Sequence, residues 1–381
     1  MIKFYLSLLL LVIAKTIFCQ IPEGYYSSAA NKAGTELQLS LHDIIDGHTV
    51  ISYNAIWDAF YSTDRTSDDK VWDIYSDIPV GSPAYTYSFV SNQCGNYSGE
   101  GDCYNREHSF PKSWFNEESP MVSDLFQVYP TDGYVNGRRG NYPYGETNSP
   151  TWASTNGSKL GPCSYSGYNG TVFEPINEYK GDLARTYFYM ATRYYGEDGD
   201  WAGSDMVEGS QPKAWALAML LEWDENDPVS QKEIDRNNAI YAIQGNRNPF
   251  IDHPEYVGYV WEGVTPDDPV VTEAPSNAVL NFSGSFITLN WTDASGENLP
   301  GGYLIVYNTE GFQSLPVPVD GTSPQNYSMS KVVSYGVGHC ILPNLQQKTK
   351  YYIKIYSFSG SGNLTDYKTD GSVPQLEKIT N

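Results

Sequence analysis

The sequence predicts an α+β domain followed by a separate all-β domain. Residues 20–263 are rich in aromatic side chains, and several stretches carry apolar residues at three- and four-residue spacing, as in amphipathic helices. After about residue 275 the pattern changes to short alternating strands that are separated by turn residues. The length of 381 residues also exceeds that of one typical domain and suits two.

The N-terminus has the pattern of a secretory signal peptide. Lys3 precedes an apolar stretch over residues 6–13, and cleavage is expected just before Gln20, so that residues 1–19 are removed. The apolar stretch is too short to favour a membrane span, and no other stretch is long and apolar enough to cross a bilayer. We therefore expect a secreted or cell-surface-associated protein, monomeric by default.

The α+β domain is predicted to contain a helix, a strand and a second helix, in that order. Residues 37–45 carry apolar residues at helix spacing and end near Gly47. Residues 71–75 alternate between apolar and polar, which is typical of a half-buried strand. The clearest helix begins at Asp182, where apolar residues recur every three or four positions and predict a single apolar face.

Two further helices are expected before the domain ends. Residues 213–223 are richly apolar and predict a buried helix. Ser230 and Glu233 have the spacing of a capping box, in which each side chain satisfies a backbone amide at the start of a helix. The apolar positions that follow predict a helix that stops at Gly245.

The second domain is predicted to be a β-sandwich that follows a linker. Residues 264–275 are acidic and rich in proline, which is typical of a linker. Beyond them, residues 276–376 contain alternating strands at 286–291, 303–307 and 351–356. Roughly a hundred residues of short strands suit a β-sandwich. The strand with Trp291 and the approach to the last strand resemble a fibronectin type III domain, an immunoglobulin-like fold.

The cysteines predict one disulfide. Removal of Cys19 with the signal peptide leaves four, of which Cys94 and Cys103 are close in sequence and separated by a glycine-rich loop that can close. In an oxidising compartment these two are expected to pair. The alternative, a metal site with Cys103 as a ligand, is disfavoured because the chain has no Cys-x-x-Cys pair and no second histidine nearby. Cys163 and Cys340 fall in different domains and are not expected to pair.

The residues best suited to chemistry begin at Glu107 and His108, which are adjacent in a polar segment flanked by aromatic residues. Neighbouring residues of an extended strand point to opposite faces, so both side chains can reach one site only where the strand ends and the chain turns. Pro111, just downstream, is consistent with such a turn. A carboxylate and an imidazole are therefore expected at the end of a strand.

A second segment, residues 129–141, supplies an amide and two arginines. Its Pro130, Thr131 and Asp132 predict the start of a helix, with Thr131 as the N-cap and Asp132 in the first turn. Asn136 then falls in the second turn. Asn136 followed by glycine could also be a simple turn, but its place after the Glu107 segment favours a ligand role.

Together these side chains indicate a metal-dependent phosphodiesterase site. Carboxylate and amide oxygens suit Mg²⁺, Mn²⁺ or Ca²⁺, and two protein ligands leave positions for water and a phosphate oxygen, as Mg²⁺ prefers. We therefore expect one divalent metal ion, Mg²⁺ in the first place. Histidine titrates near neutrality, so His108 suits a general base. The cations that could contact phosphate are Arg106, Lys112, Arg138 and Arg139.

Net charge opposes long-range attraction to such a substrate. The chain has 23 Lys and Arg against 45 Asp and Glu, a formal charge of −22. A protein this acidic is repelled by phosphate backbones at a distance. If it binds nucleic acid, it must do so through a local basic patch, a metal ion, or both.

With these motifs in order, the chain resembles the secreted bacterial endonuclease I family of His-Me finger (ββα-metal) nucleases. The motif region spans residues 94–146, with further matching stretches at 182–190 and 244–252. The resemblance implies that Glu107 and Asn136 bind the metal ion and that His108 is the general base. It also implies hydrolysis of DNA or RNA to 5′-phosphate products with little sequence preference.

The sequence departs from the family pattern at one place. Many members carry Asp-Leu-His before the Pro-Thr stretch, whereas this chain has Asp124-Leu125-Phe126-Gln127. This departure removes the second histidine of the family pattern but leaves Glu107, His108 and Asn136 unaffected. Two other functions compete with the nuclease: a non-catalytic extracellular adhesion or matrix-binding protein on a nuclease-like fold, and a secreted glycan hydrolase with paired carboxylates in a cleft.

Overall fold

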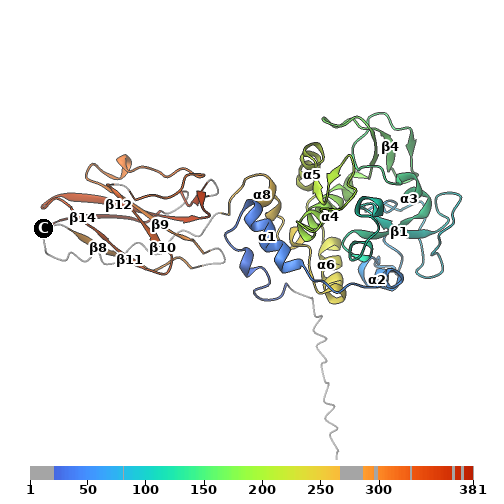
Figure 1. The fold of residues 1–381 in the computed structure, drawn as a ribbon, viewed down its shortest axis with the longest axis horizontal. Coiled ribbons are helices and arrows are strands. Elements are labelled where there is room, and N and C mark those ends of the chain that lie inside the picture. The colour runs from blue at the N-terminus through green and yellow to red at the C-terminus, as the bar shows by residue number, and fades with distance from the viewer. Residues whose placement is uncertain are drawn as a thin grey trace, which may run out of the picture.

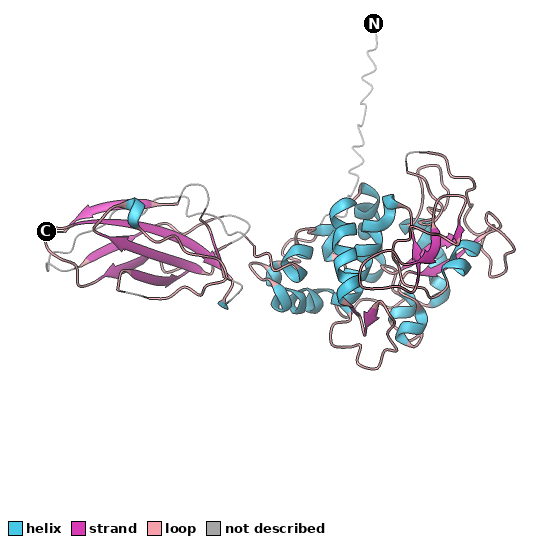
Figure 2. Ribbon diagram, turned by 90° about the horizontal axis from the view of Figure 1, so that it is seen from above, coloured by secondary structure: helices cyan, strands magenta, loops and turns pink. Residues whose placement is uncertain are grey.

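The computed structural model describes residues 21–79, 81–266, 286–295, 299–326, 328–362, 365–369 and 373–380. The expected signal peptide, most of the linker and the first residues of the second domain lie outside these ranges. The described residues form a mixed helical part and an all-strand part (Figures 1 and 2). In the part of the chain that is described, no helix is both long and apolar enough to cross a membrane.

The mixed part contains short strands among helices. Its helices are α1 (Gly34–Ile45), α2 (Ile56–Thr63), α3 (Gly133–Arg139), α4 (Lys180–Arg193), α5 (Ala214–Asn226), α6 (Gln231–Gln244), α7 (Pro249–Asp252) and α8 (Tyr256–Trp261). Its strands are β1 (Tyr104–His108), β2 (Val128–Asp132), β3 (Trp152–Ala153), β4 (Lys159–Pro162), β5 (Thr171–Glu174), β6 (Val207–Glu208) and β7 (Gln211–Pro212). Single 3₁₀ turns are η1 (Ser27–Ala29), η2 (Tyr53–Ala55), η3 (Lys112–Phe115), η4 (Met121–Ser123) and η5 (Asn177–Tyr179).

Helix α4 lies at the centre of the mixed part, as Figure 1 shows. Every residue of α4 is buried, so its polar face is covered by protein as well as the predicted apolar face. Other elements, including α1, α5 and α7, pack around it. The charged residues of α4 can be buried because they are paired: the Arg185 guanidinium donates to both carboxylate oxygens of Glu233 at 2.6 and 3.0 Å.

The other predicted helices form, and the predicted strand at residues 71–75 does not. Helix α5 is not wholly buried as predicted: its buried residues are Ala216, Met219, Leu220 and Trp223, and the rest are half-buried or exposed. Helix α6 begins with the capping box of Ser230 and Glu233 and ends at Gly245, which has the left-handed φ of 79°. Residues 71–75 are all buried and form an irregular turn rather than a strand. The Asp73 carboxylate accepts a hydrogen bond from the Tyr75 amide at 3.0 Å, which stabilises this turn in place of a ladder.

Strands β1 and β2 and helix α3 form the ββα unit that the resemblance implies. The two strands pair antiparallel, with His108 opposite Val128 and Tyr104 opposite Asp132. The predicted N-cap of α3 is wrong by one residue: Thr131 belongs to β2, and the Asp132 side chain caps the helix by accepting from the Val135 amide at 2.8 Å. The strand extends further than expected because Thr131 pairs with Asn105 across the ladder.

The all-strand part is the expected sandwich. One sheet has the order β10 (Ser330–Ser334), β9 (Gly302–Asn308), β12 (Lys350–Ser359) and β13 (Asp366–Tyr367), with β14 (Gln375–Ile379) also on β12. The other pairs β11 (His339–Leu342) with β8 (Ile287–Asn290). One further 3₁₀ turn is η6 (Phe312–Ser314). The three predicted strands correspond to β8, β9 and β12, and Trp291 lies in the core between the sheets.

The predicted disulfide between Cys94 and Cys103 is present. The sulfur of Cys103 is therefore not available as a metal ligand, which excludes that alternative. Cys163 and Cys340 are free thiols, the first half-buried and the second buried in the core of the all-strand part. The disulfide closes a loop immediately before β1. It therefore fixes Cys94 next to the start of the strand that contains Glu107.

Candidate active site

Glu107, His108 and Asn136 line one small open pocket of about 160 Å³. Strand β1 ends at His108, and the chain turns before Pro111, so two adjacent side chains reach the same space. Helix α3 follows β2 directly, and this brings Asn136 to the same pocket. The rest of the lining is Tyr53, Arg106, Pro111, Lys112, Ser113, Glu117, Gly140 and Asn141.

His108 is held in one tautomer. Its Nε2 lies 2.9 Å from the carbonyl oxygen of Val122. A carbonyl can only accept, so Nε2 carries the proton and Nδ1 keeps its lone pair. Burial lowers the pKa of His108 to about 3, against the Val122 hydrogen bond and helped by the positive charges of Lys112 and other nearby cations. The imidazole is therefore neutral at physiological pH. The expectation that His108 titrates near neutrality is wrong, because burial disfavours the charged form and makes this imidazole a weaker base than a free one.

Glu107 is 2% exposed and forms an ion pair with Arg139. Its Oε1 accepts hydrogen bonds from the Tyr75 hydroxyl at 2.7 Å and from Arg139 Nη1 at 2.8 Å. Burial raises the pKa of Glu107 to about 7, opposed by the charge of Arg139 and by the Tyr75 hydrogen bond. Both protein hydrogen bonds fall on one carboxylate oxygen, so the other is left for a ligand in the pocket.

Arg139 is buried and does not line the pocket. The side chain is 1% exposed and also donates to the backbone carbonyls of His108 and Ser109 at 2.7 and 2.6 Å. The interpretation of Arg139 as a phosphate contact is therefore wrong for this conformation. A buried guanidinium between one carboxylate and two carbonyls instead holds the end of β1 against α3.

Asn136 is oriented by a neighbour on β1. Its Nδ2 donates to the Asn105 Oδ1 at 2.7 Å. This hydrogen bond uses the amide nitrogen, so the amide oxygen of Asn136 is left for a ligand. An amide oxygen is a hard ligand, like a carboxylate oxygen. The pocket thus offers two oxygen ligands of the kind that Mg²⁺ binds, from Glu107 and Asn136.

The remaining predicted cations differ in their surroundings. Arg106 lines the pocket, with its guanidinium carbon 3.6 Å from the centroid of the Tyr53 ring, and Lys112 also lines it while its Nζ lies 3.3 Å from a Glu117 carboxylate oxygen. Arg138 is exposed on α3 and does not line the pocket. Two of the four predicted phosphate contacts, Arg106 and Lys112, are therefore beside Glu107 and His108.

Comparisons with known proteins identify the family of the chain. A sequence model of the family Endonuclease I matches residues 33–255. The chain belongs to the endonuclease I family. An extracellular ribonuclease of Bacillus amyloliquefaciens is 37% identical over 245 residues, which are 63% of this chain and 78% of that protein. An extracellular deoxyribonuclease of Aeromonas hydrophila is 27% identical over 139 residues, 36% of this chain and 52% of that protein. This family member is a nuclease.

Solved structures resemble the all-strand part of this nuclease. The FN1–FN3 domains of chicken CNTN1 match with a TM-score of 0.21 and 21% identity, over 30% of this chain and 31% of that chain. An FN3 domain of human collagen XX matches with a TM-score of 0.17 and 24% identity, over 28% of this chain and 99% of that chain.

Sequence reasoning missed three residues that hold the site of this endonuclease I family member together. Tyr53 in η2 stacks on His108 with ring centroids 5.8 Å apart, Tyr75 bonds Glu107, and Asn105 orients Asn136. The two tyrosines lie in stretches without a motif, and one Tyr among 32 carries no signal. Asn105 lies close to Glu107 and His108 in the sequence. Its contact with Asn136 depends on the pairing of β1 with β2, which the sequence motif does not show.

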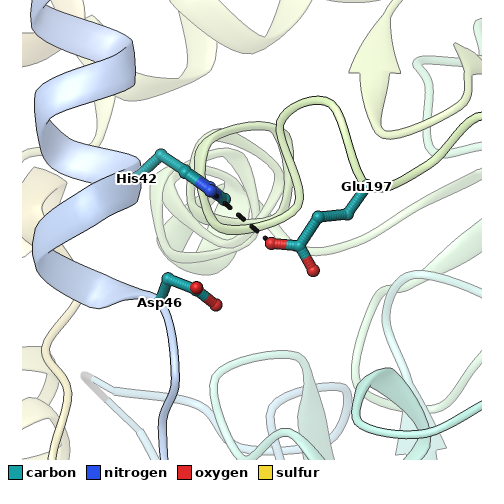
Figure 3. Close-up of side chains that lie close together, drawn as sticks. All are labelled: His42, Asp46 and Glu197. Carbon is teal, nitrogen blue, oxygen red and sulfur yellow. Dashed lines mark ion pairs between the residues drawn. The ribbon is translucent and has the colours of Figure 1, made fainter.

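A second group of side chains in the nuclease could hold a metal ion. Ligand atoms of His42, Asp46 and Glu197 lie within 4.8 Å of one another (Figure 3). Arg193 already donates to both carboxylates, at 2.7 Å to Asp46 and 3.0 Å to Glu197. This guanidinium places a positive charge where a cation would bind, so an ion-pair cluster accounts for the arrangement. None of these residues lines the pocket of His108.

Proposed function

We propose that this nuclease is a secreted, metal-dependent endonuclease that hydrolyses phosphodiester bonds of nucleic acid to 5′-phosphate products. His108 acts as the general base, and Glu107 and Asn136 hold one divalent metal ion. The observation that carries the proposal is the hydrogen bond from His108 Nε2 to the Val122 carbonyl, because it leaves Nδ1 unprotonated on a residue that lines the same pocket as Glu107 and Asn136.

The imidazole is suited to take a proton from water. It is neutral, its tautomer is set by Val122, and its plane is held by the Tyr53 ring, so a water molecule at Nδ1 loses its proton without prior rearrangement of the base. The hydroxide formed attacks phosphorus in line with the 3′ oxygen. The bond between phosphorus and this oxygen breaks, and the departing oxygen takes a proton from solvent water. Arg106 and Lys112, at the rim of the same pocket, bind the non-bridging phosphate oxygens.

The donor set fits a hard divalent cation. One free carboxylate oxygen of Glu107 and the amide oxygen of Asn136 would hold it, and the small number of protein ligands suits Mg²⁺, with Mn²⁺ or Ca²⁺ as alternatives. A bound ion supplies positive charge that stabilises the phosphorane-like transition state and the departing oxygen. Arg139 offsets the single negative charge of Glu107, so we expect weak metal binding without substrate.

Support for the substrate class comes from the relatives and from the pocket. The relatives are named as ribonucleases and as deoxyribonucleases, and several are extracellular or periplasmic. The pocket offers cations for the backbone, which every nucleic acid shares, so sequence preference is expected to be low. DNA remains the first proposed substrate, and the 37% identical ribonuclease favours RNA as a second.

Metal removal tests the proposal directly. The mature protein is expected to nick and linearise supercoiled plasmid DNA, and to fragment a long RNA, with Mg²⁺ but not with EDTA. Glu107→Ala and Asn136→Ala are expected to reduce both activities to the level seen with EDTA, because each removes one oxygen ligand. Agarose and urea gels measure the products. A well-folded protein that cleaves neither substrate with any divalent metal ion would contradict the proposal and favour the binding-protein alternative.

A separate prediction concerns Asn105. Replacing it by alanine removes the partner of the Asn136 amide and allows the amide to turn. We expect the Mg²⁺ concentration for half-maximal cleavage to rise about tenfold, since partners that orient metal ligands typically affect metal affinity by that order. Titration of cleavage with Mg²⁺ measures it. Asn226→Ala is the control, because the exposed side chain of Asn226 donates to the Glu222 carbonyl in α5 and does not line the pocket; an equal effect there would refute the assignment.

A further inference from the structure

Two arginines of the nuclease differ from the other six in their ion pairing. The other arginines each pair with a carboxylate: Arg65, Arg139, Arg185, Arg193, Arg236 and Arg247. Within the described residues, Arg106 and Arg138 have no carboxylate within ion-pair distance. The chain has a net charge of −22, so carboxylates are abundant. An arginine that pairs with none of them is therefore unusual in this protein. A guanidinium without a carboxylate can bind a phosphate.

Both of these arginines lie against a pair of aromatic rings. The Arg106 guanidinium carbon is 3.6 Å from the ring centroid of Tyr53 and 4.6 Å from that of Trp57. The Arg138 guanidinium carbon is 5.1 Å from the ring centroid of Tyr134 and 5.6 Å from that of Trp152. Arg106 belongs to the pocket of His108, whereas the Arg138 group lies outside it and has no part in the mechanism above.

The Arg138 group is open to solvent. Arg138 is exposed and Tyr134 and Trp152 are half-exposed, with their ring centroids 6.4 Å apart. Tyr134 and Arg138 are one helical turn apart on α3, and the Tyr134 hydroxyl accepts from the Arg138 Nη2 at 2.8 Å. The guanidinium is therefore fixed beside two rings rather than free to move.

Tyr97 extends this group towards Asn136. Its ring lies 6.3 Å from that of Tyr134, and its side chain covers Gly133 and Gly137. A Cβ added at Gly133 would lie 2.6 Å from a ring carbon of Tyr97, and one added at Gly137 would meet the Tyr97 hydroxyl. Tyr97 belongs to the loop that the disulfide closes, and 37% of it is exposed. A strip of Tyr97, Tyr134, Arg138 and Trp152 thus runs along α3 from the position next to Asn136.

We propose that this strip, the α3 strip, is a subsite that stacks an unpaired base of the substrate beside the cleaved phosphodiester. Aromatic rings and a guanidinium plane are the groups on which splayed bases stack, and Arg138 supplies charge for the adjoining phosphate. A base inside a duplex is already stacked and cannot reach the rings. The enzyme therefore favours single-stranded segments of DNA or RNA. This inference rests on the proposed function and names its substrate class.

Binding measurements test the α3 strip without cleavage. The full-length His108→Ala protein, or the wild type in EDTA, is titrated against a fluorescent single-stranded 12-mer of DNA, one of RNA, and a DNA duplex. Trp152→Ala is expected to weaken binding of both single strands about tenfold, in line with the loss of one base stack, and that of the duplex less than about twofold. Trp152→Phe keeps a ring and is expected to restore most of the affinity.

Two matched controls separate stacking from a general loss. Trp215 stacks on Tyr168 at 4.7 Å on another part of the surface, so Trp215→Ala is expected to leave binding unchanged. Arg65 lies 4.7 Å from the Tyr61 ring but pairs with Asp69, so Arg65→Gln is the control for Arg138→Gln. Arg138→Gln is expected to weaken single-strand binding and to lower its salt dependence by about one counterion.

Three results would overturn the α3 strip: unchanged single-strand binding in both Trp152→Ala and Arg138→Gln, an equal loss for duplex and single strand, or a Trp152→Phe variant as weak as Trp152→Ala. Arg138→Gln keeps the test valid if Trp152→Ala fails to fold, because its side chain is exposed. Wild-type cleavage of plasmid and RNA is followed in parallel. Cleavage that persists while the strip variants bind normally refutes the strip alone, and absent cleavage refutes the proposed function.

Discussion

Replacing His108 by alanine is expected to lower kcat for phosphodiester cleavage by about 10²–10⁴-fold, the usual contribution of a general base. The reason is that His108 Nδ1 is the proposed proton acceptor, held in place by the bond from Nε2 to Val122 and by the Tyr53 ring. KM is expected to change little, because Arg106 and Lys112 still face the phosphate. Steady-state cleavage of a labelled oligonucleotide with saturating Mg²⁺ measures both parameters.

A matched histidine serves as the control for this loss. His253 is 32% exposed, bonds Glu255 and does not line the pocket, so His253→Ala is expected to keep full activity. His108 is buried, and far-ultraviolet circular dichroism must show that the variant stays folded. Partial recovery of His108→Gly by added imidazole would support a proton-transfer role. A folded His108→Ala protein with wild-type kcat would show that another group is the base.

The two adjacent arginines are expected to differ sharply in their effect on stability. Arg139→Gln is expected to lower the free energy of unfolding by about 3–5 kcal/mol, because it breaks a buried ion pair and leaves Glu107 without its partner. Arg138→Gln is expected to change it by less than about 0.5 kcal/mol, since its side chain is exposed. Urea unfolding followed by tryptophan fluorescence measures this, as all but one of the nine tryptophans precede residue 262.

The activities of the same variants complete the comparison. Arg139→Gln is expected to lose cleavage as well, because Arg139 joins the carbonyls of His108 and Ser109 to Glu107 and so shapes the end of β1. Arg138→Gln is expected to keep kcat on a saturating substrate. Equal stability of the two variants would contradict the burial of Arg139 and return it to the role of a surface phosphate contact.

Local patterns predicted much of the fold because they report local interactions. The capping box of Ser230 and Glu233, the stop at Gly245 and the alternating strands of the second part depend on residues only a few positions apart. The disulfide of Cys94 and Cys103 was likewise predictable from a short, glycine-rich loop. The meeting of Glu107, His108 and Asn136 in one pocket was anticipated from the motif order, and the strand pairing accounts for it.

Local patterns were insufficient where side chains are buried on all sides. Residues 71–75 alternate like a strand, yet every side chain is buried and Asp73 stabilises a turn instead. Helix α4 has apolar residues at helix spacing, but its polar side chains are buried too because Arg185 and its neighbours are paired. Composition along one segment says nothing about which partners surround it.

Residue type and spacing suffice to predict the two-part organisation, the ββα order and the chemical identity of the candidate ligands and base. How each of these groups is used depends on the tertiary structure. It turned Arg139 inward and left Arg138 exposed, brought Tyr53 and Tyr75 from distant segments, and set the tautomer of His108 through Val122. Burial, tautomer and hydrogen-bond partners depend on contacts between segments far apart in the chain, which no local pattern contains.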